Sequence, residues 1–249
     1  METRKLHVAL LISGHPRTWK EGCEWVNKYF RPKFKKVDVY FHLWDTIDAQ
    51  STWWCENRPV AKCSTPLEEI CRSLKPECGS LDNIYKKEFH RSRLEAIWVS
   101  SNTKPFHVLS QWYSLWRVWC LMKESGAKYD MVVRHRLDID AQFEIHSKFE
   151  DGVVVGCRNS RWVKQDNRKA VCDCHAYGCM EAMEKYCSLY PVAEELLTHK
   201  IAGRANKHRM ILHPEFALAH YLKKEGVLVF EDKDYTRIIN RVDGSTKEL

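Results

Sequence analysis

The chain has 249 residues, of which 44% are hydrophobic and 29% are charged, and it carries a formal net charge of +7. This composition excludes an intrinsically disordered chain and suits a single α/β domain. No apolar run approaches the roughly 18 residues of a membrane-spanning helix, and the N-terminal apolar stretch is too short for a secretory signal. We therefore expect a cytoplasmic protein without a transmembrane segment.

The positive charge favours anionic partners, but the basic residues are scattered, and the longest cluster is the short run RPKFKK at 31–36. A polynucleotide-binding protein concentrates basic residues in patches with interleaved aromatic residues, so we expect no nucleic acid partner. The 11 cysteines include no C-x-x-C pair. In a cytoplasmic protein we expect most of them to be reduced thiols. The sequence leaves the oligomeric state open.

The first 45 residues predict a strand, a helix and a second strand. Residues 5–12 (KLHVALLI) are a continuous apolar run that ends in the loop SGHPR, a pattern typical of a buried strand. Residues 18–30 have helical spacing with Thr18 as N-cap, and residues 37–45 (VDVYFHLWD) predict the next strand, which ends at Asp45. This order favours a parallel α/β sheet.

The middle of the chain is less regular. Residues 50–95 predict an irregular insert with cysteines and tryptophans, in which Thr65, Pro66 and Glu68 indicate a helix start with a capping box. Residues 95–100 (EAIWVS) predict a third strand. Residues 107–126 predict a long helix with a broad apolar stripe, rich in tryptophan, that ends at Gly126.

The second half of the chain alternates strands and helices. We expect strands at 129–140, 152–156, 227–231 and 235–242, a helical segment at 178–200 with a break at Pro191, and a helix at 213–226. The chain contains no internal repeat and no low-complexity linker, so residues 1–249 are predicted to form one domain.

Two carboxylates end the predicted central strand. Residues two apart in a strand point to the same side, so Asp138 and Asp140 can present two carboxylates to one point, which suits Mg²⁺ or Mn²⁺. Arg134 and Arg136 share this alternation and can neutralise the carboxylates or contact a diphosphate. An isolated D-x-D is also typical of a solvated strand end.

The order of five segments adds a resemblance to a known family. These segments resemble a GT-A-fold glycosyltransferase family that is found in large algal (chlorella-type) viruses and in bacterial capsule or surface-glycan loci, and they are LISGHPRTW, HLWD, QWYSLWRVWCLMKESGAKYDMVVRHRLDID, AYGCMEAMEKYCSLY and HPEFALAHYLKKEGV. The resemblance covers nearly the whole chain, with the weakest match at 50–95 and 157–169. It implies a Rossmann-like α/β domain with a central mixed, mostly parallel sheet flanked by helices.

The resemblance also implies a donor site. Asp138 and Asp140 match the D-x-D motif, which holds Mn²⁺, or Mg²⁺, against the diphosphate of a nucleotide sugar. The first-strand loop beside the nucleotide is matched by Ser13, Gly14 and Arg17, and Asp45 matches a position near the base or ribose. The positive charge of Arg17 or Arg136 would stabilise the leaving diphosphate.

The resemblance places the acceptor side late in the chain. We expect Asp173 to be the general base of an inverting reaction, with Glu215 as the alternative, and His213 to be a third metal ligand. His175 flanks Asp173. Several tryptophans lie in or beside irregular regions and are candidates for stacking on a sugar, although core packing is the default for them: Trp53, Trp54, Trp98 and Trp162.

The sequence thus predicts a metal-dependent glycosyltransferase that uses a nucleoside-diphosphate sugar, with UDP as the expected nucleotide, to build a surface or capsid-type glycan. A viral chain would work in the host cytoplasm. Two alternatives stay open. A metal-dependent nucleotidyltransferase or nuclease also uses paired aspartates, although SGHPR holds a single glycine where a nucleotidyltransferase has a Gly-rich loop. The second alternative is a non-catalytic GT-A-like module that binds a glycan.

Overall fold

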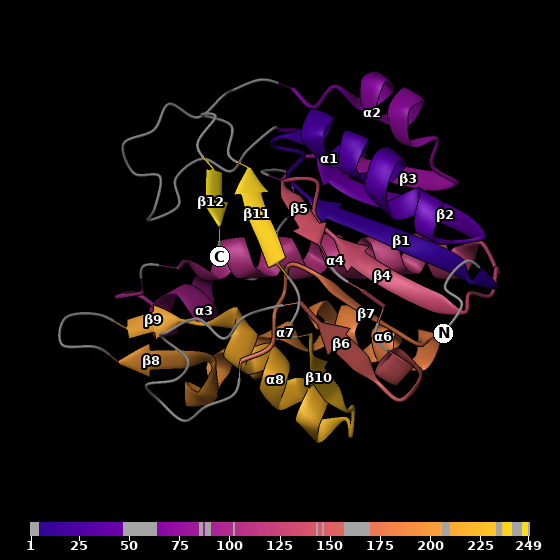
Figure 1. Ribbon diagram of the computed structural model, residues 1–249. Helices are drawn as coiled ribbons and strands as arrows, with labels where there is room; N and C mark the ends of the chain where they lie inside the picture. The colour runs from indigo at the N-terminus through magenta and orange to yellow at the C-terminus, as the bar shows by residue number, and fades with distance from the viewer. Residues whose placement is uncertain are drawn as a thin grey trace.

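A seven-stranded sheet organises the fold. The structure, a computed structural model, describes residues 5–46, 64–84, 87, 91–101, 103–142, 144–145, 147–156, 170–205, 210–232, 236–240 and 246–248. The strands of the large sheet are β1 (His7–Gly14), β2 (Lys36–Trp44), β3 (Cys78–Asp82), β4 (Met131–His135), β6 (Val153–Val155), β7 (Ala176–Gly178) and β10 (Val229–Glu231). Their spatial order is β10-β6-β7-β4-β1-β2-β3 (Figure 1).

The sheet is mixed and mostly parallel, which confirms the predicted fold class. β1 runs parallel to both of its neighbours, β2 and β4, and β3 runs parallel to β2. β10 and β6 are also parallel, whereas β7 is antiparallel to both β4 and β6. Residues 8–12 of β1 are fully buried because both faces of the sheet are covered, and this explains why the sequence of this strand is a continuous apolar run.

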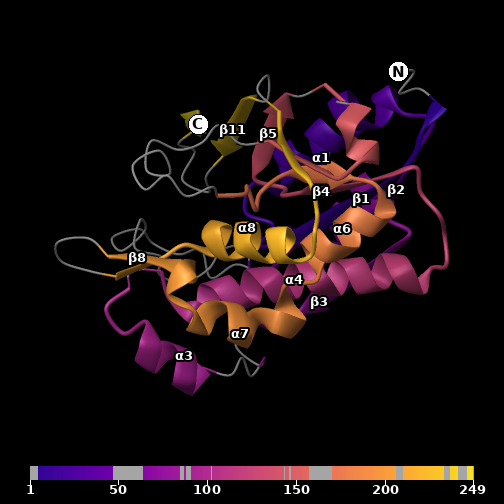
Figure 2. The ribbon, with the colours of Figure 1, turned by 90° about the horizontal axis from the view of Figure 1, so that it is seen from below.

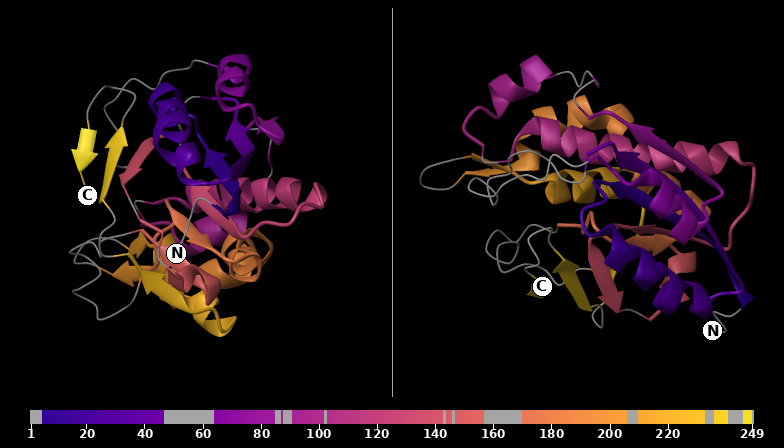
Figure 3. Two further views of the ribbon diagram at one scale, coloured as in Figure 1. Left: turned by 45° about the vertical axis from the view of Figure 1, so that its right-hand side comes forward. Right: turned by 90° about the horizontal axis from the view of Figure 1, so that it is seen from above.

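Helices cover both faces of this sheet. The helices are α1 (Trp19–Trp25), α2 (Leu67–Leu74), α3 (Arg91–Ile97), α4 (Pro105–Glu124), α6 (Met180–Cys187), α7 (Ala193–Thr198) and α8 (Pro214–Lys224). α1 and α2 pack together on one face, and α4 crosses the other face against β1 and β2 (Figures 2 and 3). α6 and α7 pack against α4, and α8 contacts both of them.

Two small sheets stand apart from the large one. β11 (Thr236–Asn240) pairs antiparallel with β5 (Ile139–Gln142) and with β12 (Thr246–Glu248). β8 (Gly203–Ala205) and β9 (Met210–Leu212) form a separate antiparallel pair. Figure 1 shows β5 leaving the end of β4 to join β11, so the chain carries the segment after β4 out of the central sheet.

Most predicted elements are confirmed, and the tryptophan-rich helix is α4. The break at Pro191 is a 3-10 turn between α6 and α7, at Tyr190–Val192. The strand predicted at 95–100 is wrong, because these residues end α3 and continue in a turn. Leu94 and Trp98 are four residues apart, as on one side of a helix, and both are buried, whereas Val99 is exposed. The apolar residues at 95–100 were therefore mistaken for a strand, and Leu94 and Trp98 are instead buried by helix packing.

The capping box at Thr65 is also wrong. α2 begins at Leu67, with Pro66 at the N-cap position. The Thr65 hydroxyl donates a hydrogen bond to the Trp44 carbonyl oxygen at 2.6 Å, so it ties α2 to the end of β2 and does not cap the helix. The eight cysteines that the structure describes are free thiols, and no helix in the same residues is long and apolar enough to cross a membrane.

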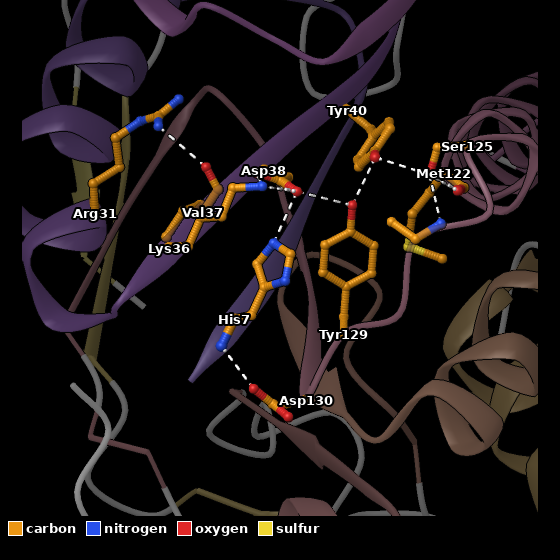
Figure 4. Close-up of polar contacts among 11 residues, drawn as sticks. His7, Arg31, Lys36, Val37, Asp38, Tyr40, Met122, Ser125, Tyr129 and Asp130 are labelled. Carbon is orange, nitrogen blue, oxygen red and sulfur yellow. Dashed lines mark hydrogen bonds and ion pairs between the residues drawn. The ribbon is translucent and has the colours of Figure 1, made fainter. Parts of the chain in front are cut away.

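A polar cluster around the buried Asp38 joins the amino-terminal ends of β1 and β2 (Figure 4). Asp38 Oδ2 accepts hydrogen bonds from Lys36 Nζ at 3.1 Å, His7 Nε2 at 2.8 Å and Tyr129 OH at 3.1 Å. The Tyr129 and Tyr40 hydroxyls lie 2.6 Å apart. Burial raises the pKa of Asp38, but the hydrogen bonds from these donors outweigh burial and leave its pKa below the ordinary value.

We expect Asp38→Asn to lower the free energy of unfolding by about 1–3 kcal/mol at pH 7, because it removes the charge that three donors share in a buried cluster. Thermal unfolding measures this loss. Because the pKa of Asp38 is lowered in the folded state, its contribution is present above the unfolded pKa of about 3.9 and is lost as the pH falls through the folded value.

The matched control is Glu24→Gln, since Glu24 is an exposed carboxylate 3.9 Å from Lys28. We expect it to change the free energy of unfolding by less than about 0.5 kcal/mol. Equal melting temperatures for the two variants at pH 7 would contradict the role given to Asp38.

Candidate functional site

The strand order reverses between β1 and β4. From β1 the chain proceeds outward through β2 to β3, and it then returns through α4 to β4 on the other side of β1. In open α/β sheets, ligands bind at such a switch point, beyond the carboxyl ends of the strands. The segments at these ends are residues 13–17 and residues 136–138. The fold therefore places the candidate site between these two segments.

The segment of residues 13–17, which begins with the last two residues of β1 and which we call the first-strand loop, is held in an unusual conformation. Gly14 has φ +109° and Arg17 has φ +35°, values that L side chains rarely adopt. The Gly14 N–H donates to Ser114 Oγ at 2.8 Å, and His15 Nδ1 lies 3.0 Å from the Thr46 carbonyl oxygen. These contacts fix the loop, so the uncommon backbone geometry is determined by its surroundings.

Two arginines grip one buried carboxylate at this site. Asp138 is 1% exposed. Arg136 Nε donates to Asp138 Oδ1 at 2.8 Å and Arg136 Nη2 to Oδ2 at 2.5 Å, a bidentate pair, and Arg17 Nη1 reaches Oδ2 at 2.5 Å. The guanidinium side chains of Arg17 and Arg136 are 20% and 21% exposed. We call these three residues the arginine clamp, and it joins the segments after β1 and β4.

The electrostatics of the clamp are dominated by these ion pairs. Burial raises the pKa of the Asp138 carboxyl, but the charges of Arg136 and Arg17 outweigh burial and hold its pKa well below the ordinary value. Burial lowers the pKa of Arg136, but the negative charge of Asp138 contributes to a net shift well above the ordinary value. The clamp is therefore fully ionised at neutral pH, and two cations share one anion.

The D-x-D pair does not lie on one strand, so the predicted strand over 129–140 is wrong in its second half. β4 ends at His135, residues 137 and 138 form a turn, and Asp140 lies on β5. The turn is held from the helical layer: Trp25 of α1 stacks on His135 at 4.1 Å and donates from Nε1 to the Ala141 carbonyl oxygen. Asp138 and Asp140 therefore do not share one strand face.

Gly22 explains how close α1 comes to this turn. A Cβ atom added to Gly22 would overlap the carbonyl oxygen of Leu137. A residue without a side chain is therefore needed where α1 packs against the turn that carries Asp138.

Asp173 lies next to the clamp through Cys174. Arg136 Nη1 is 3.4 Å from Cys174 Sγ, and Cys174 Sγ lies 3.2 Å from Asp173 Oδ1. Gln111 Nε2 of α4 donates to Asp173 Oδ2 at 2.7 Å. Arg134, fully buried in β4, donates to the Cys174 carbonyl oxygen. The predicted base is therefore oriented by Gln111 of α4 and by Cys174, which Arg134 and Arg136 contact.

His175 is a core residue in a paired imidazole contact. His135 Nε2 donates to the Ile139 carbonyl oxygen at 2.9 Å, so His135 Nδ1 accepts from His175 Nδ1 at 3.1 Å. Burial lowers the pKa of His135 to about 3, so the ring is neutral. The pair packs the turn after β4 against the segment before β7.

Ser13 and Asp45 lie at the carboxyl ends of β1 and β2. The Asp45 carboxylate accepts from Asn83 Nδ2 at 2.7 Å, and its backbone N–H donates to the Asp82 carbonyl oxygen. Ser13 Oγ and Asp45 Oδ1 are buried oxygen atoms without a hydrogen-bond partner in the described part of the chain. Such atoms are costly in a folded protein, and a functional role or a bound water or ion is the usual explanation for them.

The late candidates are less closely joined to the clamp. The Glu215 carbonyl oxygen accepts from Val171 N–H at 3.1 Å, which places the start of α8 beside the segment that carries Asp173. His213 Nδ1 lies 3.9 Å from Glu215 Oε2. Asp140 is half-buried and faces Ile238 across β5 and β11.

The predicted metal fits one of these side chains better than the others. No group of three or more His, Cys, Asp and Glu side chains gathers among the described residues. Both oxygens of Asp138 are held by guanidinium groups. Mg²⁺ and Mn²⁺ often bind through one or two carboxylates and complete their shell with water and substrate phosphates. Asp140 is the side chain that fits this chemistry.

The tryptophan candidates for sugar stacking are divided. Trp98 is buried, and its Nε1 donates to the Leu197 carbonyl oxygen at 2.8 Å, so it is a core residue. Trp53, Trp54 and Trp162 lie outside the described residues.

Sequence reasoning missed the residues that support the site from behind. Gln111 and Ser114 are polar residues within the tryptophan-rich helix α4. Their polar side chains in an otherwise apolar pattern could have indicated that they support the site. Cys174 and Gly22 carry no local signal, because their roles depend on segments that are distant in sequence.

No protein-family model matches the chain, and no curated protein matches it in sequence. Among solved structures, the chain is similar to mouse xyloside xylosyltransferase 1 in its apo form, with 9% sequence identity and a TM-score of 0.42. The match covers 90% of this chain and 84% of that chain. At this identity and TM-score, the function of this chain has to be inferred from its own site.

We expect Gly22→Ala to displace the turn at 137–138 and to lower the free energy of unfolding by about 1–3 kcal/mol, because the added methyl group overlaps the Leu137 backbone. Chemical unfolding measures the loss. Glu21→Ala, at the exposed neighbouring position of α1, is the control and should be neutral. Equal stability of the two variants would show that α1 does not constrain the turn.

We expect Arg136→Met to cost about 3–5 kcal/mol, because it leaves Asp138 buried with half of its compensation. The double variant Arg136→Met with Asp138→Asn should recover part of this loss, since it removes the uncompensated charge. Urea unfolding of the four proteins in this cycle gives the coupling energy. A coupling energy near zero would contradict the clamp.

Proposed function

We propose that the protein is a GT-A-type glycosyltransferase that transfers a sugar from a nucleoside-diphosphate sugar, with UDP as the nucleotide, to a glycan or glycoprotein acceptor. The observation that carries this proposal is the arginine clamp at the switch point of the sheet. A site with two partly exposed guanidinium groups at the carboxyl ends of β1 and β4 is suited to a diphosphate.

The clamp supports diphosphate binding by its charge and its shape. Arg17 and Arg136 already hold an anionic oxygen pair, and guanidinium groups recognise phosphate oxygens with the same planar geometry. Their exposed edges would meet the donor diphosphate and stabilise the negative charge that develops when the sugar departs. Ser13 and Asp45 would contact the nucleoside, since each has a buried oxygen atom that has no hydrogen-bond partner among the described residues.

A divalent cation, Mn²⁺ or Mg²⁺, belongs to this proposal. Asp140 would hold it together with the donor phosphates, and the cation would neutralise charge on the leaving diphosphate. Asp138 would hold Arg17 and Arg136 in place, because both of its carboxylate oxygens accept hydrogen bonds from them.

Asp173 is the proposed general base. Gln111 and Cys174 orient its carboxylate. Asp173 would accept the proton of the acceptor hydroxyl. As the acceptor oxygen forms its bond to the anomeric carbon, the proton passes to Asp173, and the bond to the diphosphate breaks with its electron pair on the phosphate oxygen. The product has inverted configuration. Glu215, beside the same segment, is the alternative base.

Calorimetric titration with UDP, with and without Mn²⁺, tests the donor site. We expect UDP to bind, Mn²⁺ to tighten binding at least about tenfold, and Asp140→Ala to abolish this tightening. Arg17→Ala should weaken binding under both conditions, because it removes a phosphate contact. Asp151→Ala, at an exposed carboxylate, is the matched control and should bind like the wild type.

Three other results would redirect the proposal. Absence of binding to UDP and to other nucleoside diphosphates would overturn the donor assignment. Binding without release of sugar to water or to any acceptor would favour the non-catalytic glycan-binding module. Equal binding of UDP with and without Mn²⁺ would remove the cation and leave the arginines as the diphosphate site.

A further inference from the structure

A buried chain of hydrogen bonds leads from the first-strand loop to the edge of the sheet. Ser114 Oγ of α4 accepts from the Gly14 N–H at 2.8 Å, and it lies 2.8 Å from His42 Nδ1 and 3.0 Å from the His42 carbonyl oxygen. His42 Nε2 lies 3.2 Å from Asp82 Oδ2. Ser114 and His42 are both fully buried, so neither can meet a substrate.

The direction of these hydrogen bonds follows from the charge of the imidazole. Burial lowers the pKa of His42 to about 4, more than the neighbouring Asp82 raises it, so the ring is neutral at pH 7. A neutral ring that faces a carboxylate carries its hydrogen on Nε2, which leaves Nδ1 as an acceptor, so Nδ1 and the His42 carbonyl oxygen are two acceptors for the single hydrogen of the Ser114 hydroxyl. The contacts thus run from the Gly14 N–H through Ser114 and His42 to Asp82.

The far end of the chain is fixed by a cation and a phenol. Lys87 Nζ lies 2.9 Å from Asp82 Oδ2, and Tyr113 OH donates to the same oxygen at 3.1 Å. Lys87 also lies over the Tyr113 ring at 4.9 Å. These contacts hold Asp82, and through it the orientation of the His42 ring.

We infer that Ser114 and His42 are positioning residues, which hold the loop of residues 13–17 in its diphosphate-binding conformation. This inference rests on the proposed function. Gly14 is three residues from Arg17, and both have positive φ, so the loop needs an anchor to keep this geometry. Ser114 supplies the anchor from α4, and Asp138 supplies the other one at Arg17.

The first measurement needs no ligand. Labelling serine carbonyl carbons and glycine nitrogens selects Ser–Gly pairs, which occur in this chain at 13–14 and 125–126. Gly126, at the far end of α4, donates its N–H to Lys123 and serves as the internal control. In Ser114→Ala we expect hydrogen exchange of the Gly14 amide to accelerate at least about tenfold, while the Gly126 amide stays unchanged.

The second measurement is UDP affinity. We expect Ser114→Ala to weaken UDP binding roughly 3- to 10-fold, because the loop must be ordered again on binding. Tyr129→Phe is the matched control: it removes one buried hydroxyl from the cluster at the opposite end of the same strands. It should lower the melting temperature as Ser114→Ala does, and it should change neither the Gly14 amide nor the UDP affinity.

The outcomes separate this inference from the proposed function. An unchanged Gly14 amide in Ser114→Ala overturns the anchor, and so does equal UDP affinity of this variant and the wild type, with the donor site intact. Wild-type protein that binds neither UDP nor GDP overturns the proposed function and the inference with it. If Ser114→Ala does not fold, Asp82→Asn decides by the same two readouts, with smaller changes in the same direction.

Discussion

The buried charge of Asp138 is the constraint on which the site depends. A carboxylate that is removed from water needs cations and hydrogen-bond donors on both of its oxygens. Arg136 supplies them from the same turn, and Arg17 supplies one from a loop that is more than a hundred residues away in the sequence. One ion-pair cluster thus fixes the distance between the segments after β1 and β4, where the strand order of the sheet reverses.

In the proposed function, the two ends of β1 and β2 divide stability from binding. At the amino ends, Asp38 is surrounded by donors, and its cluster ends at Tyr129 and Tyr40. At the carboxyl ends, the network that passes through Ser114 ends at a loop whose arginine is partly exposed. The same strands therefore carry the Asp38 cluster at one end and the partly exposed arginines of the clamp at the other. This polarity is the one that parallel sheets impose on ligand binding.

Sequence patterns predicted the elements whose burial is simple. β1 is buried on both faces, and α4 buries a wide stripe, so each produces an apolar pattern that is readable within its own residues. The prediction of one strand through Asp140 is wrong because contacts with distant segments end β4 early. α1 packs against the Leu137 backbone at Gly22, and β5 pairs with β11. Ser114 was hidden for the same reason, since its partner Gly14 lies on another element. Local patterns record burial, whereas contacts between distant segments decide where a polar side chain points.

Charge balance gives a physical reason to expect a divalent cation. Arg17 and Arg136 face Asp138, and Asp173 also raises the pKa of Arg136 through its charge. Two guanidinium groups and two carboxylates therefore leave little excess positive charge near the clamp. A diphosphate brings further negative charge into the same region, where the partly buried carboxylate of Asp140 also lies. In such surroundings the resident charges do not fully offset a diphosphate, and in the proposed function a divalent cation would supply the remaining positive charge. The resident carboxylates that organise the site in the absence of a donor are thus the reason why the proposed function includes a metal.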